Sequence, residues 1–347
     1  MSDLLPHKQA RRRQGRLRWF HTCPEMILFK PGQAPEIKFS DGNQGRGTCL
    51  GCHDSPCMEL ALTEAELSLG GSLAGFPGDP SRDVCPTDAI DWDETGTVPT
   101  IDTVNCIGCG LCAIRCPYGA INLSPDGVAV VESDDPDGIT AIETGTVEPH
   151  VRTRRVGALG SLTAPFAREM PEVIAKLTDV QGTRLALNML LACGVAANMR
   201  RKGDVNIRMD GLLLFASKQI GVVELELGAA VLELPRALLE DIAVLHGRFG
   251  IPMAQIVPVS VVGALPNGRA EYYQVIDDIA KVLDIHCRTL TFGALCLLMW
   301  RFGELNGLNE GLFTTRSGTT TLYSSLAQLI PDLPVEEPYP GAYSPPK

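Results

Sequence analysis

The sequence predicts two units of different fold class: a small cysteine-rich α+β module, followed by an α/β domain with a mixed sheet flanked by helices. Two observations predict this division. Eight of the twelve cysteines lie between residues 49 and 116, most of them only two to four residues apart. After residue 161 this pattern stops, and apolar segments typical of buried helices and strands follow one another. A chain of 347 residues is long enough for two folded units.

The first unit is organised around one stretch, Cys106-Ile-Gly-Cys109-Gly-Leu-Cys112-Ala-Ile-Arg-Cys116-Pro. Thiols separated by two, two and three residues are the pattern of a 4Fe–4S cluster, in which the thiol before proline reaches a second cluster. Gly108 and Gly110 let the loop curl tightly and turn backbone N–H groups toward the cluster sulfides. A zinc site would instead need two separated Cys-x2-Cys pairs.

An altered copy of this stretch lies upstream. Cys85-Pro-Thr-Asp-Ala-Ile parallels Cys116-Pro-Tyr-Gly-Ala-Ile, and Cys49-Leu-Gly-Cys52 and Cys57 precede it. The arrangement resembles the bacterial two-cluster ferredoxin family over roughly residues 46–131. The resemblance implies electron transfer and two ligand sets. One 4Fe–4S cluster would take Cys106, Cys109, Cys112 and Cys85, and the other would take Cys49, Cys52, Cys57 and Cys116.

The first half of the repeat departs from the family pattern at two places. Four residues separate Cys52 from Cys57 where the pattern has two, and 27 residues intervene before Cys85. A capping-box sequence at 63–66 predicts a short helix within this insertion. These departures leave the first cluster open to being labile or of the three-iron type.

The net charge of −11 is unevenly distributed. Residues 46–148 hold three arginines, no lysine and eighteen carboxylates. An acidic surface of this kind steers a redox partner with a basic surface. Residues 1–30 have the opposite charge, with seven cations against two acids, and Trp19 and Phe20 lie among them. This segment leaves nucleic acid open as a partner, and the alternative is that it lies on the chain's own acidic module.

Changes in composition predict the domain organisation. Residues 1–45 form a basic extension, 46–135 the cysteine-rich module with its inserted helix, and 136–160 a linker. Residues 161–330 form the α/β domain, and 331–347 form a proline-rich tail. The spacing of eight cysteines for clusters and the lack of a targeting segment indicate a cytoplasmic protein. No apolar stretch is long enough to predict membrane insertion.

Periodicity predicts the elements of the α/β domain. Helices are expected over 171–179, 182–201, 234–249, 269–283 and 293–302. Strands are expected over 205–216, 222–227, 253–262 and 285–292, of which the first two form a hairpin. Pro258 places the third strand at a sheet edge or a bulge, because proline cannot donate a hydrogen bond to a neighbouring strand.

Three carboxylates form a second candidate site, on the predicted hairpin. Asp210 lies on its first strand, and Glu224 and Glu226 lie two residues apart on the second, so alternation puts these two on one face. Together the three could hold Mg²⁺ and activate water. The alternative is that they face solvent or pair with Arg208 and Lys218.

The order of helix, Asp strand, Glu-x-Glu strand, helix and strand is similar to the restriction-endonuclease-like, PD-(D/E)xK superfamily over roughly residues 170–300. Glu226 stands where that motif usually has lysine. The resemblance implies catalytic roles for Asp210, Glu224 and Glu226.

Two classes of function therefore remain. The favoured one is ferredoxin-type electron transfer, with two 4Fe–4S clusters and an α/β domain that binds a partner or substrate. The alternative is a Mg²⁺-dependent nuclease or nucleic-acid-binding protein in which the clusters are structural or redox-sensing. No Gly-x-Gly-x-x-Gly fingerprint follows a strand, so neither a nicotinamide nor a flavin site is predicted, and whether the chain is itself an enzyme stays open.

Overall fold

The structure is a computed structural model, and it describes twelve stretches of the chain. These are 55–60, 73, 75–94, 99–116, 120–123, 129–131, 170–204, 207–267, 270–300, 305, 311–314 and 320–330. The basic extension, the inserted helix, the linker and the proline-rich tail lie outside the described residues, as do Cys49 and Cys52.

The cysteine-rich module contains two small hairpins. β1 (Ile90–Trp92) pairs antiparallel with β2 (Pro99–Ile101), and β3 (Ile121–Leu123) pairs antiparallel with β4 (Ala129–Val131). Each hairpin begins five residues after the cysteine of a Cys-Pro pair, so the sequence repeat is also a structural repeat. The short helix α3 (Leu111–Arg115) lies between them in the chain.

The α/β domain is built on a five-stranded mixed sheet in the order β5-β6-β7-β8-β9. Its strands are β5 (Ala196–Met199), β6 (Gly211–Leu214), β7 (Ile220–Ala229), β8 (Ile256–Ala264) and β9 (Arg288–Thr291). β6 runs antiparallel to both of its neighbours, β5 and β7, and the strands β7, β8 and β9 run parallel. The mixed sheet flanked by helices is therefore confirmed.

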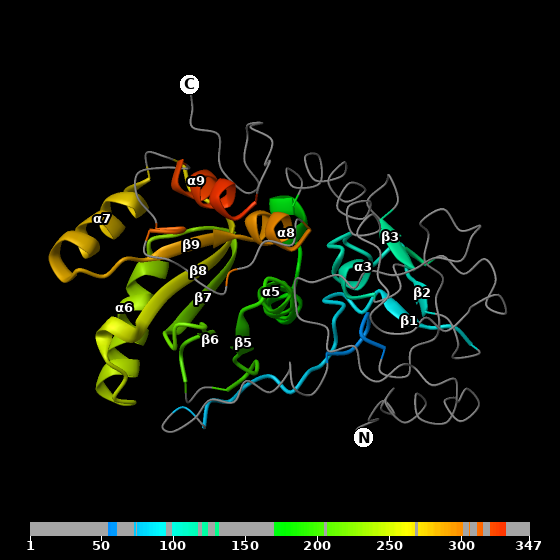
Figure 1. The fold of residues 1–347 in the computed structure, drawn as a ribbon, viewed down its shortest axis with the longest axis horizontal. Coiled ribbons are helices and arrows are strands. Elements are labelled where there is room, and N and C mark those ends of the chain that lie inside the picture. Colours follow the sequence, from blue (N-terminus) through cyan, green and yellow to red (C-terminus); the bar gives the residue numbers. More distant parts are fainter. Residues whose placement is uncertain are drawn as a thin grey trace, which may run out of the picture.

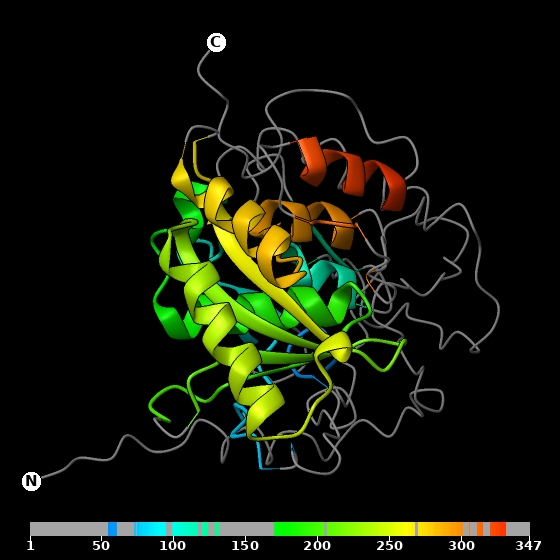
Figure 2. The same ribbon diagram turned by 90° about the vertical axis from the view of Figure 1, so that its left-hand side faces the viewer.

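The helices form a layer on each face of this sheet (Figures 1 and 2). α6 (Glu233–Gly247) connects β7 to β8 and α7 (Glu271–Leu283) connects β8 to β9, as parallel neighbours require. α5 (Asp179–Ala192) and α8 (Phe292–Trp300) cover the opposite face, and α9 (Thr320–Leu329) packs against α8. None of the helices in the described part of the chain is long and apolar enough to cross a membrane.

Two of the element predictions are wrong. The helix predicted over 182–201 ends at Ala192, because Gly194 adopts a left-handed φ of 80° and the chain then enters β5. Pro258 was expected at an edge or a bulge, yet β8 lies between β7 and β9 and is buried throughout. Proline is accommodated there because β9 pairs with β8 only from Val259 onward.

The cysteine-rich module and the α/β domain share one hydrophobic core. Leu60, Val84, Leu111 and Ile114 of the module belong to the same buried cluster as the apolar residues of α5 and α8. In Figure 1 the module lies beside α5 and α8, on the side of them that faces away from the sheet. α8 is consequently buried on all sides, which explains why every one of its nine residues is apolar or glycine.

The long insertion between Cys57 and Cys85 adds a further contact, at the edge of the sheet. Gly78 forms an antiparallel bridge with Arg200, just beyond β5. The N–H of Asp79 donates to the carbonyl of Met199 (2.8 Å), and the N–H of Arg201 donates to the carbonyl of Pro77 (2.9 Å). The insertion therefore covers the edge strand, whose backbone groups would otherwise be unpaired.

Gly263 on β8 allows the closest backbone approach in the sheet interior. A Cβ at this position would lie 2.1 Å from the carbonyl oxygen of Leu227, where β7 has a bulge. We predict that Gly263→Ala lowers the free energy of unfolding by about 1–3 kcal/mol or more, because backbone cannot yield as a side chain can. Urea unfolding measures this. Gly247→Ala at the end of α6, where a Cβ meets nothing within 4 Å, is the control. Equal stability of the two variants would contradict the prediction.

Candidate metal centre

Six of the eight predicted ligand cysteines lie in the described part of the chain, and all six are free thiols. They are Cys57, Cys85, Cys106, Cys109, Cys112 and Cys116. Cys57, Cys109 and Cys116 are buried and the other three are partly exposed. Such thiols are available for a metal group because no disulfide takes them.

The structure brings together four thiols from two distant parts of the sequence. Burial raises the pKa of Cys109, and the neighbouring thiols of Cys85 and Cys106 raise it further. Burial likewise raises the pKa of Cys112, with additional contributions from Cys109, Cys57, Cys85 and Cys106. Cys85, Cys106, Cys109 and Cys112 therefore lie near one another, and Cys57 is also close enough to affect Cys112. The first four are the set that the ferredoxin resemblance assigns to one cluster, and Cys57 belongs to the other set.

The loop around Cys109 has the conformation that a cluster loop needs. Gly108 and Gly110 both lie in the left-handed region, with φ of 67° and 79°, which glycine adopts without strain. Gly110 directly precedes α3. The N–H of Leu111 hydrogen-bonds to the Cys109 thiol and lowers its pKa, which opposes the effect of burial. A backbone donor thus already points at the sulfur, as expected from the two glycines.

The sulfurs of the two Cys-Pro pairs accept equivalent hydrogen bonds. The N–H of Ala89 donates to Sγ of Cys85 (3.2 Å), and the N–H of Ala120 donates to Sγ of Cys116 (3.3 Å). Asp88 has a left-handed φ of 54° and occupies the position where the second copy of the repeat has glycine. Each turn therefore holds its sulfur with a backbone donor four residues later.

Two ligands of the other set also lie in one place. Cys57 and Cys116 belong to one small buried cluster with Met58 and Ile121, against which the partly buried Cys85, Cys106 and Cys112 also pack. The turn before Cys57 is held from inside the module, because Nε of the fully buried Arg115 donates to the carbonyl of Pro56 (2.9 Å). Cys116 therefore lies in the same buried cluster as Cys57 of the upstream half of the repeat.

In the described part of the chain, the thiols do not form a compact site for a single metal ion. Among the described residues, no three His, Cys, Asp or Glu side chains are close enough to hold one metal ion. In a 4Fe–4S cluster each thiolate binds a different iron, so the ligands stand apart from one another. A buried donor lies beside the site as well: Nη1 of Arg184 reaches the carbonyl of Cys85, while its buried Nε has no partner within the part of the chain described.

The second candidate site contains two of its three predicted carboxylates, joined by an unpredicted one. Asp210 directly precedes β6 and accepts hydrogen bonds from Arg200 (3.0 Å) and from the N–H of Leu225 (3.1 Å). Burial is the main reason that the pKa of Glu224 rises to about 9, and a hydrogen bond with Asp241 and the charge of Asp210 raise it further. Burial also raises the pKa of Asp241 to about 6.

Asp241 was missed by the sequence analysis, although its position gave a signal. It lies on α6 among Leu238, Ile242 and Leu245, which form the buried face of that helix. The residue is only 2% exposed, and among the described residues its Oδ2 has no hydrogen-bond partner. A carboxylate at a core position of an amphipathic helix needs a partner, which Glu224 supplies in part.

The third predicted carboxylate has a different neighbour. Oε1 of Glu226 accepts a hydrogen bond from the N–H of Gly228 (2.9 Å), at the bulge in β7. The alternative for these carboxylates was pairing with Arg208 and Lys218. Asp210 instead forms an ion pair with Arg200, and Arg208 pairs with Glu240 on α6.

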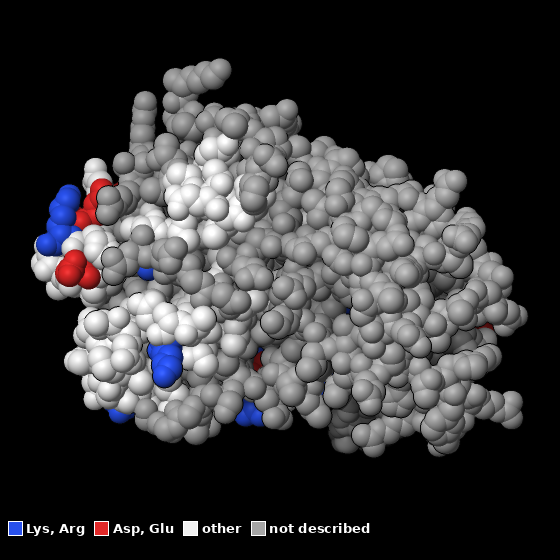
Figure 3. All heavy atoms as spheres, viewed as in Figure 1, with Lys and Arg blue, Asp and Glu red and all other residues white. Residues whose placement is uncertain are grey.

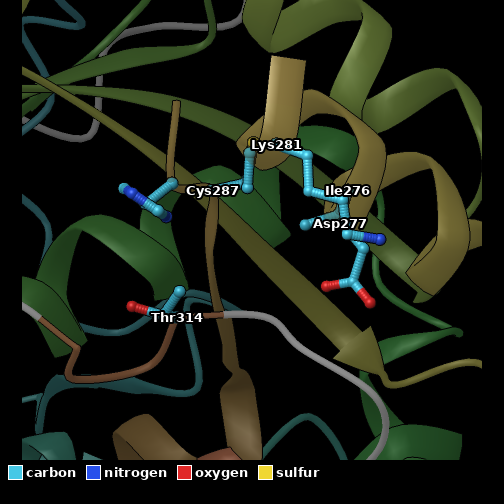
Figure 4. Close-up of a pocket in the computed structure, with 7 residues that line it drawn as sticks. Ile276, Asp277, Lys281, Cys287 and Thr314 are labelled. Carbon is cyan, nitrogen blue, oxygen red and sulfur yellow. The ribbon is translucent and has the colours of Figure 1, made fainter. Parts of the chain in front are cut away.

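A separate cavity of about 290 Å³ lies next to α7 (Figure 4). Its lining includes Asp277, Lys281, His286, Cys287 and Thr314. Burial raises the pKa of Cys287 to about 12, which disfavours the reactive thiolate form of this thiol. On the face shown in Figure 3, charged side chains of both signs gather over α7, and few others are visible on described residues. None of the six described ligand cysteines lines this cavity.

The geometry of the cysteine-rich module agrees with comparisons to known proteins. A family description of 4Fe–4S dicluster domains matches residues 82–120. This segment is a ferredoxin-type iron–sulfur domain. An uncharacterized ferredoxin of Methanocaldococcus jannaschii is 48% identical over 80 residues, which is 21% of this chain and 50% of that protein.

Two further relatives are named for redox functions. Dihydromethanopterin reductase (acceptor) of Methanosarcina mazei is 42% identical over 16% of this chain and 23% of its own length. The arsenate respiratory reductase iron–sulfur subunit ArrB of Shewanella sp. strain ANA-3 is 27% identical over 41% of this chain and 46% of its own length. The chain spans half or less of the length of each of these relatives.

For the α/β domain the comparison is much weaker. The restriction endonuclease FokI matches over 54% of this chain and 36% of its own, with 9% sequence identity and a TM-score of 0.32. A likeness at this level assigns neither fold nor function.

The raised pKa of Glu224 gives a prediction for pH dependence. Between about pH 4.5 and pH 9 the folded state binds a proton at Glu224 that the unfolded state has lost. The free energy of unfolding therefore falls as pH rises through this window, by at most ~1.4 kcal/mol per pH unit. We expect Glu224→Gln, which keeps an amide donor toward Asp241, to be more stable than the wild type at pH 8 in EDTA. The difference should disappear near pH 4.

Thermal melting at both pH values measures this effect. Glu226→Gln, two residues along the same strand, is the matched control. A Glu224→Gln variant that is destabilised equally at pH 4 and pH 8 would contradict the prediction.

Proposed function

We propose that the protein is an electron carrier that holds two 4Fe–4S clusters, with an α/β domain that binds a redox partner or a substrate. The observation that carries this proposal is the meeting of Cys106, Cys109 and Cys112 with Cys85 from the upstream repeat. When bound, the clusters supply one-electron chemistry. The second set of ligands would be Cys49, Cys52, Cys57 and Cys116.

The chain's own residues contribute orientation and exclusion of water. The buried positions of Cys109 and Leu111 keep solvent from the motif, and the N–H groups of Leu111, Ala89 and Ala120 point at cysteine sulfurs. Backbone donors of this kind stabilise negative charge on the thiolates. The acidic composition of residues 46–148 supports a partner with a basic surface.

Metal content tests the proposal. Protein purified without oxygen should contain about eight irons and a matching amount of sulfide. Cys109→Ala should remove one cluster, and Cys57→Ala should convert or remove the other, because each change takes a ligand from a different set. Iron and sulfide analysis with low-temperature EPR provides the measurement. Cys287→Ala, which removes a buried thiol outside the module, should leave the iron content unchanged. A preparation with only zinc, or without iron, would overturn the proposal.

A second candidate function rests on the carboxyl cluster. We propose that a divalent metal ion draws Asp210 and Glu224 together, with Glu226, the third ligand first expected, or Asp241 completing the site. Binding would require a movement of these side chains, because no three of them already lie close enough to hold one ion. The buried and unpartnered Oδ2 of Asp241 favours this, because a cation would satisfy it. Such a site could support a Mg²⁺-dependent nuclease, with nucleic acid as the partner.

Magnesium titration tests this second candidate. Bound Mg²⁺ would replace repulsion between the carboxylates with attraction, so the melting temperature of the protein should rise as Mg²⁺ is added. Asp210→Asn should lose this rise and any cleavage of DNA or RNA while keeping its iron. Loss of the rise in Asp241→Asn but not in Glu226→Gln would identify the third ligand. A melting temperature that ignores Mg²⁺ in the wild type would exclude the site.

A further inference from the structure

The loop that carries Cys109 is held by a residue of the α/β domain. Trp300, the last residue of α8, donates its indole N–H to the carbonyl oxygen of Cys109 at 2.9 Å. The side chain of Trp300 is only 1% exposed, so this bond is shielded from water. One helical turn earlier, burial raises the pKa of Cys296, and the nearby thiol of Cys109 raises it further. The end of α8 is therefore in direct contact with the ligand loop.

The segment that carries Cys85 is held by the other helix of the same layer. Arg184 on α5 donates from Nη1 to the carbonyl of Cys85 (3.3 Å) and forms ion pairs with Asp88 (2.8 Å) and Asp83 (3.4 Å). Its side chain is only 15% exposed. One turn later, Nδ2 of Asn188 donates to the carbonyl of Asp83 (3.0 Å). Four contacts from two residues of α5 thus fix this segment.

The two ligand sets differ in how they are supported. The turn at Cys57 is held by Arg115, which belongs to the cysteine-rich module itself. In contrast, both chain segments that supply the set of Cys85, Cys106, Cys109 and Cys112 are bonded to α5 or α8. The spacing between Cys85 and Cys109 therefore depends on two helices that are more than sixty residues away in the sequence.

We propose that Arg184 and Trp300 are positioning residues that couple this cluster to the α/β domain and set its midpoint potential and its retention. The inference rests on the proposed function, since it assumes a 4Fe–4S cluster on these four thiols. A cation beside a ligand backbone stabilises the more negative, reduced state, so Arg184 raises the midpoint potential. Asp83 and Asp88 offset part of this charge. Trp300 fixes Cys109 and excludes water from its loop.

Two substitutions of Arg184 distinguish the effect of its charge from the effect of its hydrogen bonds. Arg184→Gln should lower the midpoint potential of this cluster, because it removes the cation and leaves Asp83 and Asp88 unpaired. Arg184→Lys keeps the charge and should keep most of the potential, but it loses the branched hydrogen bonding. Both variants should release iron to a chelator about tenfold faster, as expected for the loss of a charged hydrogen bond. Redox titration followed by EPR measures the potential, and the signal of this cluster is the one missing from Cys109→Ala.

The matched control for charge is Arg236→Gln on α6, whose ion pairs are with Glu233 and Glu240 on the opposite face of the sheet. It removes the same charge from the same domain and should change neither the potential nor the release of iron.

Trp300 is tested by Trp300→Phe, which keeps an aromatic ring but removes the N–H donor. Iron release from this cluster should become about tenfold faster, with the other cluster unaffected. Tyr272→Phe is its control, because Tyr272 on α7 loses one buried hydrogen bond, to Thr289 (2.9 Å), within the same domain. That control should release iron as the wild type does.

The possible outcomes separate the two levels of the proposal. A wild-type protein without iron overturns both the proposed function and this inference. A wild type with two clusters, together with Arg184→Gln and Trp300→Phe variants that match it in potential and iron release, overturns the inference alone. A fall in potential in Arg184→Gln that Arg184→Lys restores supports it, since a merely structural role would not follow the charge.

Discussion

The burial of α5 and α8 between the sheet and the cysteine-rich module is the constraint on which the rest of the structure depends. Both helices present apolar residues to the sheet on one side and to Leu60, Val84, Leu111 and Ile114 on the other. α8 has no polar side chain at all except the indole of Trp300, so it could not face water on either side. Without the module, this apolar surface would be exposed.

The packing against α5 and α8 also stabilises the cysteine-rich module, which is small. The described hairpins are three residues per strand and α3 has five residues, which is too little to form a large core. Small modules of this kind need metal groups or a neighbouring domain for stability. Here the α/β domain supplies part of the core and the hydrogen bonds to the ligand segments. The long insertion before Cys85 adds to this by pairing with the edge of β5.

The two candidate sites differ in how the charge of their buried groups is balanced. The thiols of Cys109 and Cys112 are buried close together, which raises their pKa values and favours the protonated state until a metal replaces the proton. At the carboxyl cluster, burial raises the pKa values of the hydrogen-bonded Glu224 and Asp241, and Arg200 balances the charge of Asp210. Both sites thus contain buried groups whose charge needs a partner. Only the thiol site has the support of known relatives.

The sequence by itself determined the features that depend on near neighbours in the chain. The spacing of Cys106, Cys109 and Cys112, the left-handed Gly108 and Gly110, and the repeat of the Cys-Pro turn are local, and the structure has them where the sequence placed them. The order of elements from β6 to α8 also follows from periodicity, because each element buries one face or one stripe, whereas β5 lies where a helix was predicted and α9 was not predicted.

Only the tertiary structure decided the features that join distant segments. Pro258 lies in an inner strand because β9 begins pairing one residue later, which no local pattern reveals. Asp241 joins Glu224 because α6 lies across β7, and Arg184 and Trp300 reach Cys85 and Cys109 because two helices pack against the module. Such contacts depend on how whole elements pack, whereas periodicity states only which face of each element is buried.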